Sequence, residues 1–340
     1  MKKKLALITG VSGQDGAYLA QLLLKKNYRV VGADRRSGRS DMWRLKRLGI
    51  DKKIIHEEIE LSELYDINRL LKKYKFDEIY NLAAQSFVKS SFNSPISTSN
   101  ITAIGVIRIL ETIREINPKI KFYQASSSEM FGEVLEKRQN EKTPFNPRSP
   151  YAVAKLYGHY ITKNYRESYN LFAVSGILFN HESPLRGEEF VTRKITKGLV
   201  SIINGSLKYL ELGNIYSKRD WGYAKEYVEA IWKMLQNKKP KDYVISTGET
   251  HTIKEFVNEA IKILKIDAKW IGKGLNEKLV DRKSKKIIIK INPKYFRPAE
   301  VNLLVGDSNK AKKDLGWKAN TKFKKLVDIM VNEELDNYIR

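Results

Sequence analysis

The chain has 340 residues, of which 42% are hydrophobic and 30% are charged, and it contains no cysteine. These proportions are typical of a soluble globular protein, no apolar run approaches the ~20 residues that cross a membrane, and the missing cysteine excludes disulfides, reactive thiols and thiolate metal sites. The net charge of +24 raises the hypothesis of a nucleic-acid partner, but the lysines are spread along the chain without a nucleic-acid-binding motif, so we expect no such partner.

The first half of the chain alternates strand and helix patterns. Short apolar runs predict buried strands, and apolar residues at helical spacing predict the helices between them. The predicted strands lie at residues 5–10, 28–34, 77–84, 121–127 and 171–179, and the predicted helices at residues 14–27 and 99–116. This alternation predicts an α/β fold with a Rossmann-type, doubly wound parallel sheet.

The rhythm changes after about residue 180. Irregular stretches at 181–190 and 272–286 alternate with isolated helical patterns such as residues 224–236. We therefore predict that residues 1–180 form a dinucleotide-binding domain, to which some later segments return. Residues 181–340 are expected to form mainly a smaller α/β substrate domain that rests on the carboxyl ends of the sheet.

The N-terminal residues do not resemble a signal peptide. The basic start is followed by an apolar run that Thr9 and Gly10 interrupt well short of a usable hydrophobic region. Together with the missing cysteine, this pattern predicts a cytoplasmic protein.

Glycines follow the first predicted strand. Gly10, Gly13 and Gly16 stand between that strand and the next helix, where glycine permits a tight turn and lets backbone N–H groups approach a pyrophosphate at the helix N-terminus. The second strand ends at Asp34, which is followed by Arg35 and Arg36. Arginines there pair with a 2′-phosphate and favour NADP, whereas the acid would bind ribose hydroxyls and leaves NAD possible.

Hydroxyl and carboxyl side chains end the strand at 121–127. Ser126, Ser127, Ser128 and Glu129 stand at its carboxyl end, which is where ligands bind in such sheets. A serine-rich turn that merely caps the strand is the alternative, because serine favours turns. Glu129 favours a site with acid–base chemistry.

Tyr151 and Lys155 are four residues apart. On a helix this spacing places both side chains on one face, one turn apart, where an ammonium would ease loss of a phenolic proton whose usual pKa is ~10. For the pair alone, an amphipathic helix that carries both residues by chance is the simpler interpretation. Beside Glu129, a serine hydroxyl and a dinucleotide site, the pair predicts acid–base chemistry around a hydride acceptor.

With these residues the chain resembles the extended short-chain dehydrogenase/reductase family and, within it, the GDP-mannose 4,6-dehydratases. The motifs that carry the resemblance run from near residue 5 to near residue 320. They are ITGVSGQDGAYLA, YNLAAQSFV, YQASSSEMFGE, RSPYAVAKLYG, ILFNHESPLRGEEFVTRKIT, GNIYSKRDWGYAKEYVEAIW and NPKYFRPAEVNLLVGDSNKAKKDLGWK.

The resemblance implies roles for individual residues. Its catalytic positions fall on Ser127, Glu129, Tyr151 and Lys155. Its cofactor positions fall on Gly10, Gly13, Gln14, Asp15, Gly16, Arg35, Arg36, Leu82, Ala83, Ala84, Gln85, Ser86, Lys155, His181 and Arg186. Its GDP-sugar positions fall on Asn180, Val191, Lys194, Arg219, Arg297 and Glu300. No metal is implied.

The implied reaction is an internal hydride transfer on a GDP-sugar. Tyr151, assisted by Lys155, takes the proton of the C4 hydroxyl while hydride passes from C4 to NADP⁺. Glu129 then removes the C5 proton and helps water to leave from C6, after which the hydride returns to C6. Ser127 stands where the family usually has threonine and keeps the hydroxyl. Such proteins often assemble as tetramers, so a homotetramer or homodimer is expected.

Several alternatives stay open at this point. A nucleotide-sugar epimerase or reductase keeps Tyr and Lys but does not need Glu129. A GDP-heptose could undergo the same dehydration, and a non-catalytic dinucleotide-binding protein could lose the reactive residues. His181 could make only a structural hydrogen bond, and Trp221 is expected to pack in the core.

Overall fold

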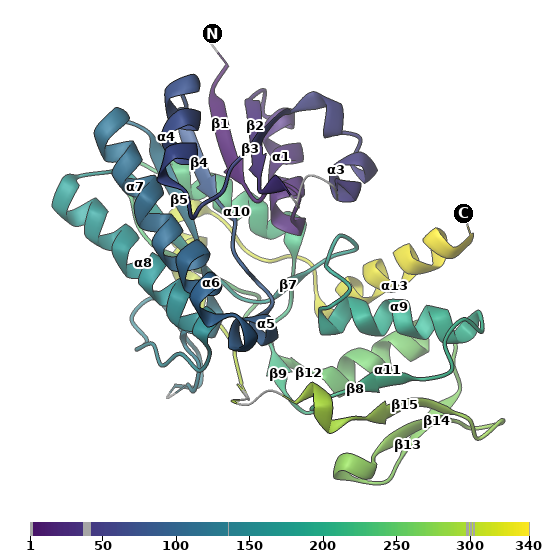
Figure 1. The fold of residues 1–340 in the computed structure, drawn as a ribbon. Coiled ribbons are helices and arrows are strands. Elements are labelled where there is room, and N and C mark those ends of the chain that lie inside the picture. The colour runs from purple at the N-terminus through teal and green to yellow at the C-terminus, as the bar shows by residue number, and fades with distance from the viewer. Residues whose placement is uncertain are drawn as a thin grey trace.

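The computed structural model describes residues 3–36, 42–134, 136–296, 299, 301 and 303–339 (Figure 1). At its centre is a sheet of seven strands in the order β11-β6-β5-β4-β1-β2-β3, and all neighbouring pairs are parallel. The strands are β1 (Leu5–Thr9), β2 (Arg29–Asp34), β3 (Ile55–Glu58), β4 (Glu78–Asn81), β5 (Lys121–Ser127), β6 (Ala173–Leu178) and β11 (Tyr243–Ile245).

Hydrophobic side chains on both faces explain why this sheet is parallel and buried. Strands β1, β4 and β6 are buried along their whole length, as is typical of parallel strands covered by helices on both sides. Alternate residues of β1 face opposite sides: Ala6 and Ile8 join one hydrophobic cluster, and Leu5 and Leu7 join the other.

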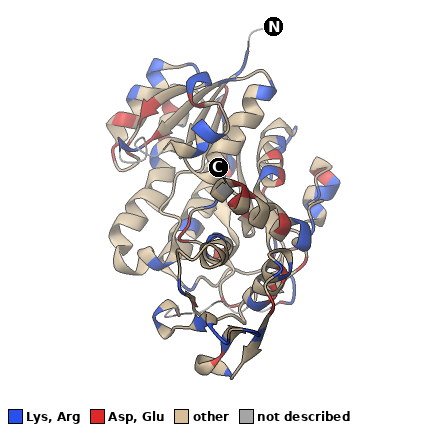
Figure 2. Cartoon of the chain, turned by 90° about the vertical axis from the view of Figure 1, so that its right-hand side faces the viewer, with Lys and Arg blue, Asp and Glu red and all other residues tan. Residues whose placement is uncertain are grey.

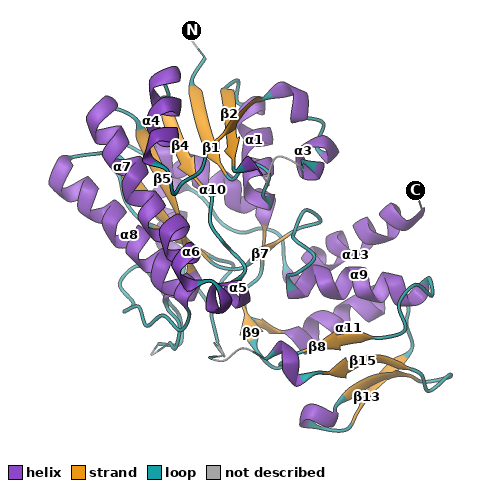
Figure 3. Cartoon of the chain, viewed as in Figure 1, coloured by secondary structure: helices purple, strands orange, loops and turns teal. Residues whose placement is uncertain are grey.

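Helices cover both faces of the sheet (Figure 3). Side chains from α1, α3 and α10 share one of these clusters, and side chains from α4, α7 and α8 share the other. The helices are α1 (Gln14–Lys25), α3 (Trp43–Arg47), α10 (Ala224–Gln236), α4 (Leu64–Lys73), α7 (Gly105–Ile116) and α8 (Pro150–Tyr169). The predicted Rossmann-type fold is confirmed.

A smaller α/β unit lies beside the carboxyl ends of the sheet (Figure 1). It has a four-stranded sheet in the order β13-β14-β15-β8, and three helices share a hydrophobic core with it. Its elements are β8 (Leu210–Leu212), β13 (Ala268–Ile271), β14 (Lys278–Asp281), β15 (Ile287–Ile291), α9 (Val191–Ile203), α11 (Ile253–Ile263) and α13 (Phe323–Ile339).

Short elements join these units. Two small pairings, β7 with β10 and β9 with β12, lie where the chain passes between them. The short elements are α5 (Val88–Asn93), α6 (Pro95–Ser99), α12 (Asn309–Leu315), β7 (His181–Glu182), β9 (Lys218–Arg219), β10 (Gly222–Tyr223), β12 (His251–Thr252), the π-helical turn η2 (Asn100–Ile104), and the 3₁₀ turns η1 (Asp51–Lys53), η3 (Ser128–Met130), η4 (Gly274–Asn276) and η5 (Pro293–Tyr295).

The charged side chains are distributed over the molecule. In the view of Figure 2, Lys and Arg occur on both units and are interspersed with Asp and Glu. In the part of the chain that the structure describes, no helix has the length and apolar character that a membrane span requires.

Candidate active site

Two adjoining cavities lie at the carboxyl ends of the central sheet. The larger, of about 670 Å³, is lined by residues of both units and is called the large cavity below. The smaller, of about 370 Å³, surrounds the glycine-rich turn after β1 and is called the glycine cavity. The two share lining residues, among them Asp15, Leu82 and Arg186. An elongated ligand could therefore extend from one into the other.

The glycine-rich turn fixes the wall of the glycine cavity. Gly10 has φ +74°, and a Cβ atom on Gly16 would lie 2.3 Å from the carbonyl oxygen of Gly10. Helix α1 begins after Gly13 with no side chain capping its first N–H groups. Such a helix N-terminus leaves N–H donors available to an anion.

Asp34 and the arginines after it lie at the end of β2. The carboxylate of Asp34 accepts a hydrogen bond from the backbone N–H of Ser12 at 3.0 Å, and burial raises the pKa of Asp34 to about 6. Arg35 lines the glycine cavity, whereas Arg36 is exposed and does not line either cavity. Of the two arginines predicted to contact the cofactor, the structure therefore places only Arg35 at the glycine cavity.

Every other residue that the sequence predicts for the cofactor lines a cavity. Gly10, Gly13, Gln14, Asp15, Gly16, Leu82, Ala83, Ala84, Gln85 and Ser86 line the glycine cavity. Lys155 and His181 line the large cavity, and Arg186 lines both. The close-packed glycine turn, the uncapped helix N-terminus and the neighbouring cation fit a nicotinamide dinucleotide.

Ser127, Glu129, Tyr151 and Lys155 meet in the large cavity. Ser127 ends β5, and the backbone N–H of Glu129 donates to its hydroxyl at 3.2 Å. Helix α8 begins directly after Ser149, whose hydroxyl accepts from the N–H of Ala152 at 3.1 Å. This cap fixes where α8 starts and therefore where its first two turns present their side chains.

Tyr151 and Lys155 share one face of α8, as predicted. The Lys155 Nζ lies 5.8 Å from the centre of the Tyr151 ring and donates a hydrogen bond to the carbonyl oxygen of Ala125 at 2.7 Å. Burial raises the pKa of Tyr151 to about 12, although a hydrogen bond with Ser127 and the charge of Arg186 act in the opposite direction. Burial lowers the pKa of Lys155 to about 8, and the charge of Asp15 acts against that change.

Asp15, which is half-buried, and His181, which is buried, form an ion pair beside these groups. His181 Nε2 lies 2.8 Å from Asp15 Oδ2, and its Nδ1 lies 2.7 Å from the carbonyl oxygen of Phe179. Both partners are acceptors, so both ring nitrogens must donate, and the ring is an imidazolium. The charge of Asp15 raises the pKa of His181 against the effect of burial, and that of His181 lowers the pKa of Asp15 against the same effect.

Four of the six residues predicted for the GDP-sugar line the large cavity. Asn180, Val191, Lys194 and Arg219 line it, whereas Arg297 and Glu300 lie outside the described residues. The Asn180 Oδ1 atom is buried and accepts no hydrogen bond within the described part of the chain. A buried acceptor without a partner is costly, so this atom is suited to a ligand donor.

Sequence reasoning missed several residues of the two cavities. Arg44 lines the glycine cavity and donates to the carbonyl oxygens of Ser12 at 3.1 Å and Leu185 at 2.6 Å. Tyr295 lines the large cavity with the Lys194 Nζ 3.6 Å from its ring centre. No local pattern marks either residue, because the contacts that place them there join distant segments.

Trp221 both packs in the core and lines a cavity. Its side chain is 3% exposed and packs against Phe256 and Phe323 in the core of the smaller unit, as predicted. It also lines the large cavity. Among the described residues, no group of three or more His, Asp or Glu side chains could bind a metal ion.

Solved structures show where this fold recurs. The chain aligns with dTDP-glucose 4,6-dehydratase from Bacillus anthracis in complex with NAD at a TM-score of 0.81 and 20% identity, covering 99% of this chain and 98% of that one. It aligns with RMD from Pseudomonas aeruginosa complexed with NADPH at a TM-score of 0.75 and 19% identity, covering 98% and 100%. At these identities the likeness concerns the fold.

Curated relatives are much closer in sequence. A GDP-mannose 4,6 dehydratase of Drosophila melanogaster is 49% identical over 98% of this chain and 87% of its own length. A GDP-mannose 4,6-dehydratase of Vibrio cholerae serotype O1 is 48% identical over 99% of this chain and 95% of its own. The sequence profile of the GDP-mannose 4,6 dehydratase family matches residues 7–330. On these grounds, and with the predicted residues gathered in two adjoining cavities, the chain belongs to the GDP-mannose 4,6-dehydratase family.

Proposed function

We propose that the chain removes water from GDP-mannose to give GDP-4-keto-6-deoxymannose, with NADP bound beside the sugar. The observation that carries this proposal is that Glu129 shares the large cavity with Tyr151 and Lys155, and that this cavity adjoins the glycine cavity. The net change oxidises C4 to a ketone, reduces C6 to a methyl group and releases one water. No external oxidant is consumed.

The glycine cavity and the junction with the large cavity would hold the cofactor. The first N–H groups of α1 would bind its diphosphate, and Arg35 would favour a 2′-phosphate. When bound, the nicotinamide supplies a hydride acceptor and, later in the same turnover, a hydride donor. NAD is the alternative cofactor, because Asp34, which accepts a hydrogen bond from Ser12, stands where an acid binds the ribose hydroxyls of NAD.

Tyr151 would accept the proton of the C4 hydroxyl. Because its pKa is raised to about 12 in the ligand-free chain, ionisation at neutral pH needs positive charge nearby. Lys155 supplies part of it: with a pKa of about 8, it stays mainly an ammonium at neutral pH and loses that charge as the pH rises through about 8. Ser127 would hold the same hydroxyl by a hydrogen bond.

Glu129 would act at the next two carbons. A 4-keto group acidifies C5, so a carboxylate in reach can remove the C5 proton and then pass a proton to the departing C6 hydroxyl. On the sugar side, Lys194 and Arg219 offer cations for the GDP diphosphate. An epimerase needs no acid at C5 and C6, so Glu129 argues against that alternative.

We also propose that the protein is cytoplasmic and forms a homodimer or homotetramer. The missing cysteine supports the compartment. Assembly is supported by apolar side chains on the outer face of α8: Val153, Tyr157 and Tyr160 are 54%, 39% and 51% exposed. A second copy that packs on this face would remove them from water, and light scattering on the purified protein measures the assembly.

Incubation of the purified protein with GDP-mannose and catalytic NADP⁺ tests the reaction. We expect the sugar nucleotide to lose the mass of one water with no net change in nicotinamide absorbance, and Glu129→Gln to stop the loss. The control is Glu133→Gln, an exposed glutamate paired with Arg148, which should keep the activity. Turnover of a GDP-heptose alone would contradict the substrate, and cofactor binding without turnover of either sugar would contradict the catalytic proposal.

A further inference from the structure

We propose that the buried ion pair between Arg193 and Glu334 positions Arg186, so that the C-terminal helix α13 sets the affinity for the cofactor. The inference rests on the proposed function, in which the cofactor occupies the junction of the two cavities, which Arg186 lines. Arg193 and Glu334 would touch neither cofactor nor sugar, because neither lines the large cavity or the glycine cavity. They are therefore positioning residues.

The ion pair joins two helices of the smaller unit. Arg193 on α9 and Glu334 on α13 are 6% and 8% exposed, and the Nε–Oε1 distance is 2.7 Å. Both helices are anchored in the same hydrophobic core. A buried charge is strongly unfavourable without its partner, so loss of Glu334 would also displace the guanidinium of Arg193.

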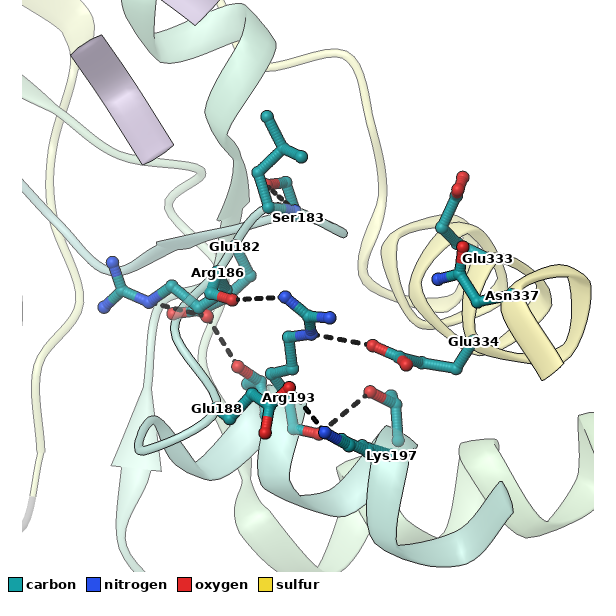
Figure 4. A network of polar contacts seen from close by, with 12 residues as sticks. Glu182, Ser183, Arg186, Glu188, Arg193, Lys197, Glu333, Glu334 and Asn337 are labelled. Carbon is teal, nitrogen blue, oxygen red and sulfur yellow. Dashed lines mark hydrogen bonds and ion pairs between the residues drawn. The ribbon is translucent and has the colours of Figure 1, made fainter. Parts of the chain in front are cut away.

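The guanidinium of Arg193 reaches the loop that carries Arg186. Its Nη1 donates to the carbonyl oxygen of Arg186 at 2.8 Å. Figure 4 shows Arg193 between Arg186 and Glu334. One side chain thus links the backbone of the loop to α13.

The side chain of Arg186 is held separately. Its Nε lies 3.2 Å from Glu182 Oε2, and its guanidinium lies 3.6 Å from the centre of the Phe190 ring. The same oxygen of Glu182 accepts a hydrogen bond from the hydroxyl of Thr192 at 2.5 Å. These contacts aim the guanidinium toward the junction only while the loop backbone stays in place.

Helix α13 is also connected to the loop through α3. Arg47 on α3 pairs with Glu333 and donates to Asn337 Oδ1 at 2.8 Å. On the same short helix, Arg44 donates to the carbonyl oxygen of Leu185, the residue before Arg186. The carbonyl oxygens of two successive loop residues, Leu185 and Arg186, therefore accept hydrogen bonds from arginines. Arg193 pairs directly with α13, and Arg44 lies on α3, which α13 contacts.

The position of Arg186 makes this arrangement consequential. Arg186 lines both cavities, so its cation stands where a ligand extending between them must pass. A shift of the loop backbone would move that cation away from an anionic ligand. If the ion pair served stability alone, its loss would lower Tm without changing the contribution of Arg186 to binding.

Titration of the protein with NADPH, followed by nicotinamide fluorescence, separates these possibilities. We expect Arg193→Gln to raise the Kd about tenfold, Arg186→Gln to raise it by a similar factor, and the double variant to resemble Arg186→Gln alone. Multiplicative losses in the double variant, or an unchanged Kd in Arg193→Gln, would overturn the proposal. Wild-type protein that does not bind NADPH would overturn the proposed function, and this inference with it.

A matched control is the ion pair between Arg166 and Asp242. It is also mostly buried, with an Nη2–Oδ2 distance of 2.7 Å, but neither residue lines the large cavity or the glycine cavity. Arg166→Gln should lower Tm and leave the NADPH Kd within twofold of wild type. If Arg193→Gln does not fold, Glu334→Gln replaces it, and its several-fold rise in Kd should disappear when Arg186→Gln is also present. Persistence of that rise would contradict the inference.

Discussion

The two cavities are built in different ways. One wall of the glycine cavity is a continuous turn after β1, in which backbone groups and missing side chains form the surface, and side chains of other segments complete the cavity. The large cavity collects side chains from α5, β5, α8, α9, β9 and η5, which lie far apart in the sequence. An added side-chain atom in the turn would clash with backbone atoms and so disturb the structure. In the large cavity, a substitution can remove a single reactive atom and leave the structure unchanged.

Loss of one oxygen atom in the large cavity should have the greatest effect. Tyr151→Phe removes the phenolic oxygen, so kcat should fall by ~10² to 10⁴-fold, as is usual for loss of a general acid–base group. The Kd for NADPH should stay close to that of wild type. Steady-state kinetics with fluorescence titration measure both, and Tyr157→Phe on the outer face of α8 is the control. A large loss of NADPH affinity in Tyr151→Phe would contradict this assignment, because it would mean that Tyr151 in the large cavity also binds the cofactor.

Addition of one carbon atom to the glycine turn should act on structure and cofactor together. The Cβ of Gly16→Ala would meet backbone atoms of Gly10 and Val11 at 2.3 Å and 2.6 Å, which should lower the free energy of unfolding by about 1 to 3 kcal/mol and weaken NADPH binding. Gly13→Ala, with its closest contact at 3.2 Å, should be milder. Urea unfolding and NADPH titration would detect both, and equal effects of the two substitutions would contradict the steric reason.

The pH dependence of stability should reveal the ion pair between the cavities. The folded-state pKa of His181 is raised. Its contribution to the free energy of unfolding is therefore complete below the unfolded pKa of ~6.5 and is lost as pH rises through the folded-state pKa. The folded-state pKa of Asp15 is lowered, so its contribution exists above the unfolded pKa and is lost as pH falls through the folded one.

A comparison of His181→Gln with wild type isolates this contribution. The difference in Tm should be larger at pH 6 than at pH 9, because the wild-type ion pair is complete only at the lower of these pH values. The ring resonances of His181 should titrate above the usual range in NMR spectra. A Tm difference that does not change with pH would mean that the imidazolium is not needed.

The smallest effect is expected at Asp34. Burial raises its pKa to about 6, so the ionised carboxylate disfavours folding at neutral pH. Asp34→Asn should therefore raise the free energy of unfolding at pH 7 by on the order of 1 kcal/mol and shift binding a few-fold toward NADPH over NADH. Urea unfolding at pH 7 and at pH 4.5 would show a gain that shrinks at the lower pH. A loss of stability in Asp34→Asn would contradict this prediction. It would mean that the hydrogen bond from the Ser12 N–H stabilises the fold only when its acceptor is a charged carboxylate.

Short-range patterns predicted the parts of the molecule that short-range physics determines. The strands at 5–10, 28–34 and 121–127, the glycine turn and the shared face of Tyr151 and Lys155 follow from local spacing, and the structure confirms them. Two strands of the central sheet were not predicted. β3 has the sequence IHEE, which contains no apolar run, and β11 has only three residues, which are too few for a periodic pattern.

Contacts between residues that are far apart in the sequence could not be predicted from local patterns. Asp15 and His181 are 166 positions apart, and Arg44 and Leu185 are 141 positions apart. The predicted helix at 99–116 also differs in detail: the chain forms the π-helical turn η2 over its first residues and only then α7. The local pattern of apolar residues is the same in both kinds of helix, so hydrophobic spacing alone does not separate them.

The place of β11 has a consequence for how the protein is made. β11 pairs with β6 and forms one border of the central sheet, so the sheet is completed only after Ile245 has left the ribosome. Until then β6 has an unpaired edge, which is open to association with other nascent chains. Ribosome-bound chains that end before β11 should therefore depend more on chaperones than chains that end after it.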